Sequence, residues 1–371
     1  MTSFSRQSLL RAVQLAASVT LKNTPKACLK GILVKVNKDK CTITSTDLEN
    51  TITIEVDCDG KDSFEALPDA RKLLDILSNI GDVQFVNLGK TDDALNISTD
   101  FSDFDLKDCD SPDTYPASVE TEPDVSFTLE ATTLIPSLKR TCPFFADESA
   151  RYAIKGIKFE MHDGKLILVA TDGKRLAVER LPVPGMEASS ETYVVPDKAI
   201  RLFSSAAKNN GEAFIGFTKN IFTAKLGDIA ISAKMVEGRY PTWQDVLPKK
   251  IEHKLPLNVG AFLSMTRQAC CMVTEETRAV QYAISNGVMT AKAQDSIAGK
   301  AFIKMPIAYD GQSFVFNLDG HTVREMLNVW TPDDELTLLV PKKLEVVEFR
   351  FGESYQHVIV PIQVAAAKEA A

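Results

Sequence analysis

The sequence predicts an α+β fold made of three tandem copies of one domain, in which two helices pack on a β-sheet. Three segments share one pattern without an insertion, an alternating apolar run, a turn and a second alternating run. They read GILVKVNKDKCTITSTD (31–47), GIKFEMHDGKLILVATD (156–172) and AVQYAISNGVMTAKAQD (279–295). This pattern is typical of a β-hairpin. The final aspartates, Asp47, Asp172 and Asp295, lie 125 and 123 residues apart, which is a domain-sized spacing.

Each copy is expected to run helix, hairpin, strand, second helix and further strands. In the first copy an apolar stripe at helical spacing indicates the first helix, with Leu9, Val13 and Ala16 on one face. Pro68 is expected near the first turn of the second helix, with Leu73, Leu74, Ile76 and Leu77 toward the core. The remaining predicted helices cover 68–80, 133–142, 196–208, 259–273 and 318–330. The predicted domains are 1–125, 126–252 and 253–371.

Composition places the chain among ordinary globular proteins, with 44% hydrophobic and 25% charged residues. No apolar run approaches the ~18–20 residues that a membrane span needs. The N-terminal segment lacks the apolar core of a signal peptide, and a mitochondrial presequence is the alternative interpretation of its amphipathic start. The seven cysteines contain no CxxC pair, which favours reduced cytosolic thiols that mostly fill the core.

The net charge of −8 argues against nucleic-acid binding, but the charges are unevenly distributed. Residues 1–46 carry eight basic side chains and one acid, Asp39, whereas residues 91–125 are rich in aspartate. This segregation suggests one basic and one acidic surface. An arbitrary fluctuation among solvated faces is the alternative.

The sequence contains no recognisable catalytic, metal or cofactor site. Gly89-Lys90-Thr91 resembles the end of a phosphate-binding loop, but Gln84 stands where the first glycine is needed, so a turn at a strand edge is favoured. The four histidines are dispersed without metal-ligand spacing. The carboxylate pairs at 147–148 and 333–335 suit helix starts or solvated faces better than acid–base catalysis.

Specific motifs then resemble the bacterial DNA sliding clamp family, the β subunit of DNA polymerase III. They are ARYAIKGIKFE (150–160), LVATDGKRLAV (168–178), YVVPDKAI (193–200), GDIAISAKMVEGRYPTWQDVLP (227–248) and HVIVPI (357–362). The resemblance runs through all three copies as far as Ile362. It implies a non-catalytic processivity factor, although the holoenzyme to which it belongs has DNA-directed DNA polymerase activity.

The resemblance further implies a head-to-tail homodimer that closes into a ring, slides on double-stranded DNA without reading sequence, and has helices lining its pore. Twelve helices packed about 8–10 Å apart would enclose a hole roughly 25 Å across. The implied partners are the clamp loader, the DNA polymerase III α subunit and other proteins with a clamp-binding motif. The implied location is cytoplasmic, at the nucleoid or replication fork. A three-domain α+β enzyme such as a nucleotidyltransferase and an interaction scaffold that never meets DNA are the rival hypotheses.

Three sets of site residues follow from the resemblance. The peptide-binding pocket is expected at Ile154, Thr171, Gly173, Lys174, Arg175, Leu176, Pro241, Val246, Leu344, Val346, Val358, Val360, Pro361 and Ile362. DNA contacts are expected from Arg6, Arg11, Lys22, Lys26, Lys139, Arg140, Arg151, Tyr152, Lys198, Arg201 and Arg267. The dimer interface is expected at Leu73, Ile76, Leu77, Phe104, Leu106, Cys271 and Met272.

The chain departs from the family pattern in four places. Asp245 stands where a basic residue is common, which predicts a changed peptide preference, and Ala153 replaces an aromatic residue after Arg151-Tyr152. The pocket has no clear counterpart for the family's tyrosine around 318–322. The extra segment at 364–371, VAAAKEAA, is expected to fray.

Overall fold

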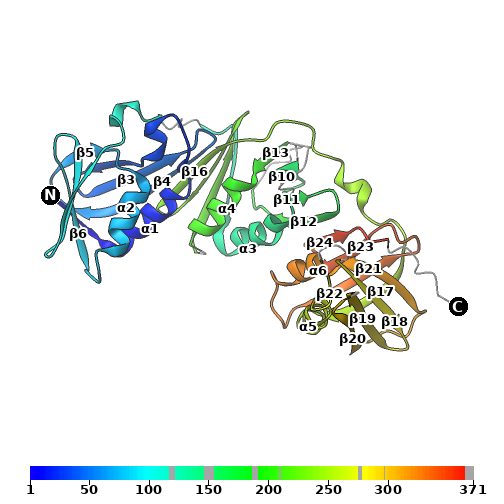
Figure 1. Ribbon diagram of the computed structural model, residues 1–371. Helices are drawn as coiled ribbons and strands as arrows, with labels where there is room; N and C mark the ends of the chain where they lie inside the picture. The colour runs from blue at the N-terminus through cyan, green and yellow to red at the C-terminus, as the bar shows by residue number, and fades with distance from the viewer. Residues whose placement is uncertain are drawn as a thin grey trace. The chain divides into compact units, whose positions relative to one another are not determined.

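The computed structural model describes residues 1–116, 122–145, 154–185, 191–208, 210–274, 278–295 and 297–363. The described helices are α1 (Arg6–Ala17), α2 (Ala70–Asn79), α3 (Ala131–Thr141), α4 (Asp197–Ala206), α5 (Val259–Cys270) and α6 (Gly320–Leu327) (Figure 1). The first twelve strands are β1 (Thr2–Ser5), β2 (Leu33–Asn37), β3 (Lys40–Thr46), β4 (Asn50–Asp59), β5 (Ser63–Ala66), β6 (Phe85–Lys90), β7 (Ala94–Ser98), β8 (Asp103–Lys107), β9 (Val125–Glu130), β10 (Gly156–His162), β11 (Lys165–Thr171) and β12 (Arg175–Pro182). The next twelve are β13 (Thr192–Pro196), β14 (Glu212–Phe217), β15 (Ile221–Leu226), β16 (Ile229–Lys234), β17 (Ile251–Asn258), β18 (Ala279–Ser285), β19 (Val288–Asp295), β20 (Gly299–Pro306), β21 (Phe314–Asp319), β22 (Glu335–Pro341), β23 (Val347–Phe351) and β24 (Tyr355–Ile359). The α+β class is confirmed, and every predicted helix is present, with bounds a few residues different from those expected.

The chain forms two compact units. Unit 1 combines Met1–Ile135 with Val195–Met235, and unit 2 combines Pro136–Val194 with Val236–Ala371. The central copy therefore contributes strands to both units. This division follows packing, so the domain bounds at 125 and 252 remain predictions. In the described ranges, no helix is long and apolar enough to cross a membrane.

All three predicted hairpins are present. The pairs β2–β3, β10–β11 and β18–β19 are antiparallel, and each is closed by a two-residue turn. The turns at Asp163-Gly164 and Asn286-Gly287 have positive φ at both residues, as the tight turn favoured by right-twisted strands requires. In the first hairpin, Lys38 takes the positive φ of 58°. The predicted hairpins are therefore confirmed, and their two-residue turns set the strand register.

The repeated aspartates perform the same local task in each copy. Asp47, Asp172 and Asp295 each accept two hydrogen bonds from the backbone N–H groups two and three residues further along, at 2.6–3.0 Å. Those bonds lower the pKa of Asp295 and help to lower the pKa of Asp47, although burial alone would raise it. The aspartates thus fix the loop between each hairpin and the strand that follows it, β4, β12 or β20.

Unit 1 is built on one sheet with the order β8-β7-β6-β1-β4-β16-β15-β14-β9, and β2, β3 and β5 branch from β4. Helix α1 buries Leu9, Ala12, Val13 and Ala16 against this sheet and against α2. Asp69 caps α2 by accepting N–H bonds from the first turn. Pro68 lies directly before this cap, near the first turn as expected, and its backbone bridges to Asp108.

Unit 2 contains two sheets. One has the order β13-β10-β11-β12-β24-β23-β22-β17, and the other has the order β20-β19-β18-β21. Helix α5 packs on strands of both sheets and against α6. Asn258 caps α5, and Asp319 caps α6. Rings from α5 and the sheets, among them Phe262, Tyr282 and Phe349, fill the core between them.

Neighbouring copies are joined strand to strand. The last strand of the second copy, β16, pairs with the fourth strand of the first copy, β4. The last strand of the third copy, β24, pairs with the fourth strand of the second copy, β12. We call these two contacts the first and second junctions. Each junction lies within one unit, so two copies share one continuous sheet in each unit.

Candidate functional site

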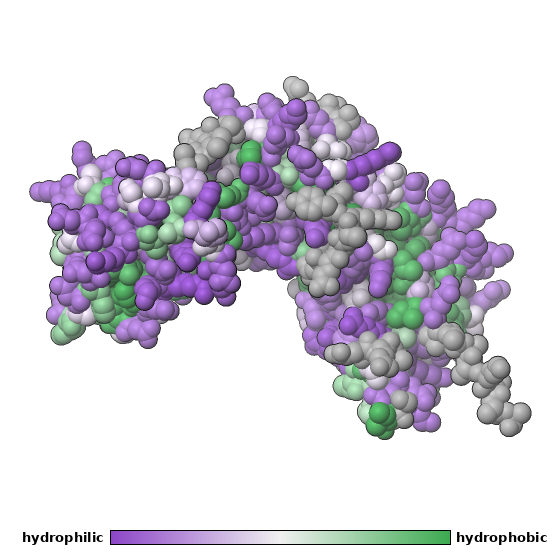
Figure 2. All heavy atoms as spheres, turned by 45° about the horizontal axis from the view of Figure 1, so that its top comes forward, coloured by the Kyte–Doolittle hydropathy of each residue, from purple (hydrophilic) through white to green (hydrophobic). Residues whose placement is uncertain are grey.

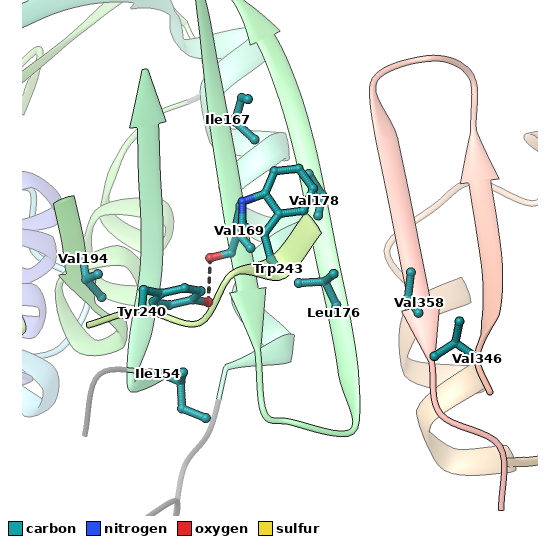
Figure 3. Packing of buried hydrophobic residues seen from close by; sticks show 10 residues of the cluster. All are labelled: Ile154, Ile167, Val169, Leu176, Val178, Val194, Tyr240, Trp243, Val346 and Val358. Atoms are coloured by element: carbon teal, nitrogen blue, oxygen red, sulfur yellow. Dashed lines mark hydrogen bonds between the residues drawn. The ribbon is translucent and has the colours of Figure 1, made fainter. Parts of the chain in front are cut away.

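The predicted pocket residues lie in unit 2, and several of them meet in one apolar cluster (Figure 3). The cluster consists of Ile154, Ile167, Val169, Leu176, Val178, Val194, Tyr240, Trp243, Val346 and Val358. Its members are at most 9% exposed. Four of them, Ile154, Leu176, Val346 and Val358, were predicted. The second and third copies both contribute, so the cluster depends on the second junction.

Two aromatic residues that the sequence analysis did not name anchor the segment crossing this cluster. The Tyr240 hydroxyl donates to the Val169 carbonyl at 3.2 Å, as the dashed line in Figure 3 marks. The Trp243 Nε1–H donates to Glu160 at 3.1 Å. Burial would raise the pKa of Glu160, but the bonds from Lys158 and Trp243 lower it overall. The GRYPTWQDVL motif contained both aromatic residues and could have indicated them, because buried Tyr and Trp need polar partners.

Beside the cluster lies a groove with a volume of about 620 Å³. Its lining residues come from β21, the loop before β23 and the segment after β24: Val315, Phe316, Asn317, Leu344, Glu345, Val360, Pro361, Ile362 and Gln363. Leu344, Val360, Pro361 and Ile362 were predicted. Leu344 and Val360 are 40% and 43% exposed. The sequence analysis missed the β21 wall, whose residues are far from the others in sequence.

Backbone hydrogen bonds fix the segment 358–362, which runs from the cluster to the groove. Val358 lies opposite Leu176 in the β12–β24 ladder. The Val360 N–H then donates to the Lys174 carbonyl at 2.9 Å, and the Ile362 N–H donates to the Asn317 carbonyl at 2.9 Å. The groove wall is therefore held at both ends by main-chain bonds and does not depend on side-chain packing alone.

Arg175 fixes the loop beside the second junction. Its guanidinium group binds Asp172 at 2.8 Å, Glu325 at 2.5 Å and the Pro143 carbonyl at 3.2 Å. Burial would lower the pKa of Arg175, but Glu325 and Asp172 raise it overall. The Thr171 hydroxyl donates to the Arg175 carbonyl at 2.7 Å. The bonds of Arg175 thus hold this loop in place.

Four further predicted pocket residues are exposed and do not line the groove: Gly173, Lys174, Pro241 and Val246. Val246 is 44% exposed at the end of the short 3-10 helical turn Trp243–Val246. Asp245 is exposed on the same turn. A groove in which apolar side chains alternate with polar ones such as Asn317, Glu345 and Gln363 suits a short peptide with apolar anchors and some polar contacts. Within the described residues, no cluster of ligands could hold a metal ion.

The predicted DNA-contact residues differ in whether their charged groups are exposed or paired with another group of the fold. Lys22, Lys26 and Lys139 are exposed. Arg11 binds Asp228 at 2.8 Å and the Ala206 carbonyl at 2.9 Å. Arg140 binds the buried Glu179, with Nε at 3.0 Å from one carboxylate oxygen. The Arg11 guanidinium group is paired within unit 1 and the Arg140 guanidinium group within unit 2, because acceptors of the same unit lie within hydrogen-bond distance of each.

The other predicted DNA contacts also have partners in the fold. Arg6 donates to the Ser78 carbonyl at 3.5 Å, and Arg267 donates to Asn328 at 2.7 Å. Lys198 forms an ion pair with Asp47, and Arg201 lies 3.9 Å from Asp197. Arg151 and Tyr152 lie outside the described residues, as does the 364–371 segment.

The predicted dimer residues divide into core and surface positions. Leu73 and Leu77 are fully buried in unit 1, so they pack in the α2 core and cannot present a surface to a partner. Their inclusion in the interface was wrong. Ile76, Leu106 and Met272 are half-buried, Phe104 is 37% exposed, and Cys271 is exposed. These five remain candidates.

Comparisons with known proteins agree with the geometry. Two family models match, the DNA polymerase III beta subunit N-terminal domain at residues 2–118 and its central domain at 128–242. The beta sliding clamp of Proteus mirabilis is 24% identical over 362 residues, covering 96% of this chain and 98% of the relative. That of Pseudomonas aeruginosa is 24% identical over 329 residues, covering 88% and 89%.

Solved structures show the same fold. The DNA polymerase III subunit beta from Pseudomonas aeruginosa superposes with a TM-score of 0.89 at 22% identity, over 98% of this chain and all of the other. The subunit from Borrelia burgdorferi gives a TM-score of 0.90 at 16% identity, over 98% and 99%. The two matched family models together span well over half of the sequence, and on this evidence the chain belongs to the DNA polymerase III beta subunit family.

Proposed function

We propose that this protein is a DNA sliding clamp, a processivity factor that encircles duplex DNA and tethers the replicative polymerase. The observation that carries the proposal is the correspondence of the whole chain. Both family models match in order, and the beta sliding clamp of Proteus mirabilis is covered over 98% of its length. The same hairpin, turn and aspartate cap recur in each of the three copies.

The duplex would be held by topology, and basic side chains would only centre it. Contacts from exposed lysines such as Lys22, Lys26 and Lys139 would go to phosphates, which carry no sequence information. Such contacts weaken steeply with salt. The excess of acidic residues over the whole chain would repel DNA from other surfaces. A closed ring of two head-to-tail copies follows from the same proposal, since heterologous contacts that close form rings.

The groove and the adjoining cluster would receive the partner proteins. Polymerase III α subunit, clamp loader and repair proteins would each insert a short segment with apolar and aromatic anchors. The apolar wall at Leu344, Val360 and Ile362 supports this role, because burial of a few such anchors supplies most of the affinity of a short peptide. The protein itself would be non-catalytic and would act at the replication fork on the nucleoid.

Runoff from DNA tests this function directly. The purified protein is loaded by a clamp loader on nicked circular DNA, and the complex is isolated by gel filtration. The circle is then cut once with a restriction enzyme. We expect the clamp to remain on the intact circle and to leave the linear DNA. Equal retention on both forms, or no association with either, would contradict the proposal, and the same assay separates a ring from a scaffold or an enzyme that binds DNA locally.

A further inference from the structure

One face of β24 connects the groove with a set of charged side chains in unit 2. Val360, directly after β24, lines the groove, and Val358, two residues earlier, belongs to the apolar cluster. Alternate residues of a strand lie on the same face of its sheet, so Gln356 shares the face of Val358. Gln356 lies opposite Val178 of β12 and opposite Arg350 of β23. The face therefore changes from apolar to polar within two residues of the cluster.

Two carboxylates on this face are bonded to cations of the same sheet. Glu160 of β10 forms an ion pair with Lys158 at 2.8 Å. Glu348 of β23, whose side chain is 1% exposed, accepts a bond from Arg350 Nε at 2.5 Å and from Gln356 at 2.8 Å. Each of these two acids therefore has its own positive partner.

Arg180 is a third cation on the same face. It lies two residues after Val178 on β12, so it shares the face of the apolar cluster. Its guanidinium carbon lies 5.6 Å from the centre of the ring of Trp243, which packs in the cluster beside Val178 (Figure 3). The Arg180 side chain is half-buried. Among the described residues, no acceptor forms a hydrogen bond or an ion pair with its guanidinium group.

The charges around Arg180 do not compensate it fully. Burial, and secondarily the charge of Arg350, lower the pKa of Arg180, although Glu348 and Glu160 act in the opposite direction. The two acids are already bonded to Arg350 and Lys158. A guanidinium group that loses water without gaining an acceptor is destabilised, and a carboxylate from a bound molecule would supply that acceptor. The environment of Arg180 therefore favours an anion.

This position is within reach of a segment bound in the groove. Val360 and Gln356 are four residues apart along an extended strand, which corresponds to about 13 Å. A partner segment that follows β24 covers this distance with about four extended residues. The groove is open to such a segment, because Leu344 and Val360 are 40% and 43% exposed. In the space-filling view, apolar side chains of unit 2 gather in patches on a mainly hydrophilic surface (Figure 2).

We propose that Arg180, together with Arg350, forms a subsite for a carboxylate, and that the partner segments bound in the groove carry an acidic residue about four residues from their apolar anchors. The inference rests on the proposed function and specifies which segments are selected. Arginine suits this task, because its planar group donates two parallel hydrogen bonds to a carboxylate. The apolar anchors then supply affinity, and the subsite distinguishes acidic from neutral or basic segments.

Peptide binding to the full chain tests the inference, by fluorescence anisotropy at low salt. Three labelled peptides share one core of leucine and phenylalanine anchors. The neutral peptide has a pair of asparagines four residues before the core and another pair four residues after it. Each acidic peptide has aspartates in place of one of these pairs. We expect one acidic peptide to bind at least about tenfold more tightly than the neutral one. This advantage should shrink as the salt concentration rises.

Substitutions of Arg180 separate charge recognition from packing on Trp243. Arg180→Gln should abolish the advantage of the acidic peptide and leave the affinity for the neutral peptide unchanged, which also shows that the variant is folded. Arg180→Glu should instead favour a peptide with lysines at the same place. Lys219→Gln, in an exposed turn of unit 1, removes one positive charge elsewhere and should keep the tenfold preference.

The possible failures are distinguishable. The subsite is overturned, with the groove intact, if the wild-type chain binds all three peptides equally. It is also overturned if Arg180→Gln weakens the neutral and acidic peptides alike, because Arg180 then only supports the packing of Trp243. A wild-type chain that binds none of the three peptides overturns the proposed peptide site itself.

Discussion

Replacing Arg140 by alanine separates a structural role from a DNA-binding role for this residue. Its guanidinium group binds both carboxylate oxygens of Glu179 and donates to the Ser137 hydroxyl at 2.9 Å. It also stacks 4.9 Å from the Trp330 ring. In addition, its backbone carbonyl accepts a bond from Tyr355 at 3.3 Å. Arg140→Ala removes the charge that compensates a carboxylate whose side chain is 1% exposed.

The expected loss of stability is large. Breaking a buried ion pair by removing one partner costs about 3–5 kcal/mol. The Arg140 side chain is 21% exposed, so water relieves part of that cost and we expect the lower end, about 3 kcal/mol. With a urea dependence of about 3 kcal/mol per molar for a fold of this size, the midpoint should fall by about 1 M.

Tryptophan fluorescence suits this measurement, because the chain has two tryptophans and both Trp243 and Trp330 lie in unit 2. Urea unfolding followed at these residues therefore reports on the unit that contains Arg140. Lys139→Ala, at the exposed neighbouring position, is the control and should shift the midpoint by less than about 0.2 M. Adding Glu179→Gln to Arg140→Ala should recover part of the loss, since no uncompensated charge is then buried. A midpoint unchanged by Arg140→Ala, together with weaker DNA binding, would refute the reasoning.

Three further outcomes follow from single side chains. Burial, and secondarily the charge of Arg175, lower the pKa of His357 to about 3, so the folded protein favours the neutral imidazole. The free energy of unfolding should therefore decrease as the pH falls below ~6.5, by roughly 3 kcal/mol at pH 4. His357→Phe should remove this part of the pH dependence of unfolding. Val360→Asp should weaken binding of an apolar clamp-binding peptide at least about tenfold in calorimetry, whereas Ser354→Asp in the preceding turn should not; equal affinities would rule out the groove. Phe104→Arg on β8 should yield monomers in light scattering, and a dimer of unchanged size would exclude this seam.

The hairpins and helices could be predicted because their signals are local. The turns at Asp163-Gly164 and Asn286-Gly287 fix the register of the flanking strands, and the apolar stripe of α1 identifies its buried face. Pairing between copies could not be predicted this way. The partners of β4 and β12 lie more than 170 residues further along the chain, and nothing in their own patterns identifies those partners.

The site residues show the same limit. Resemblance identified Val360, Pro361 and Ile362, whereas the opposite wall at Val315 and Asn317 became visible only through the Ile362 backbone bond. Leu73 was misjudged for a related reason. A basic or apolar residue on a helix can face a partner molecule or a neighbour in its own fold, and sequence spacing does not distinguish the two. For Arg140 the structure shows the buried partner Glu179, and its contact with DNA stays a prediction.

The two junctions also explain why a partner groove is expected at one of them. At the end of β16 the position equivalent to Val360 is Lys234, and the chain continues to Val236, whose N–H donates to the Val194 carbonyl at 2.8 Å. After β24 the equivalent segment is Val360-Pro361-Ile362, which lies against the β21 edge. A charged side chain at the first junction is poorly suited to an apolar peptide anchor, whereas valine, proline and isoleucine at the second accept one. The two junctions therefore share one backbone geometry, and the partner groove proposed at the second has Val360 where the first has the charged Lys234.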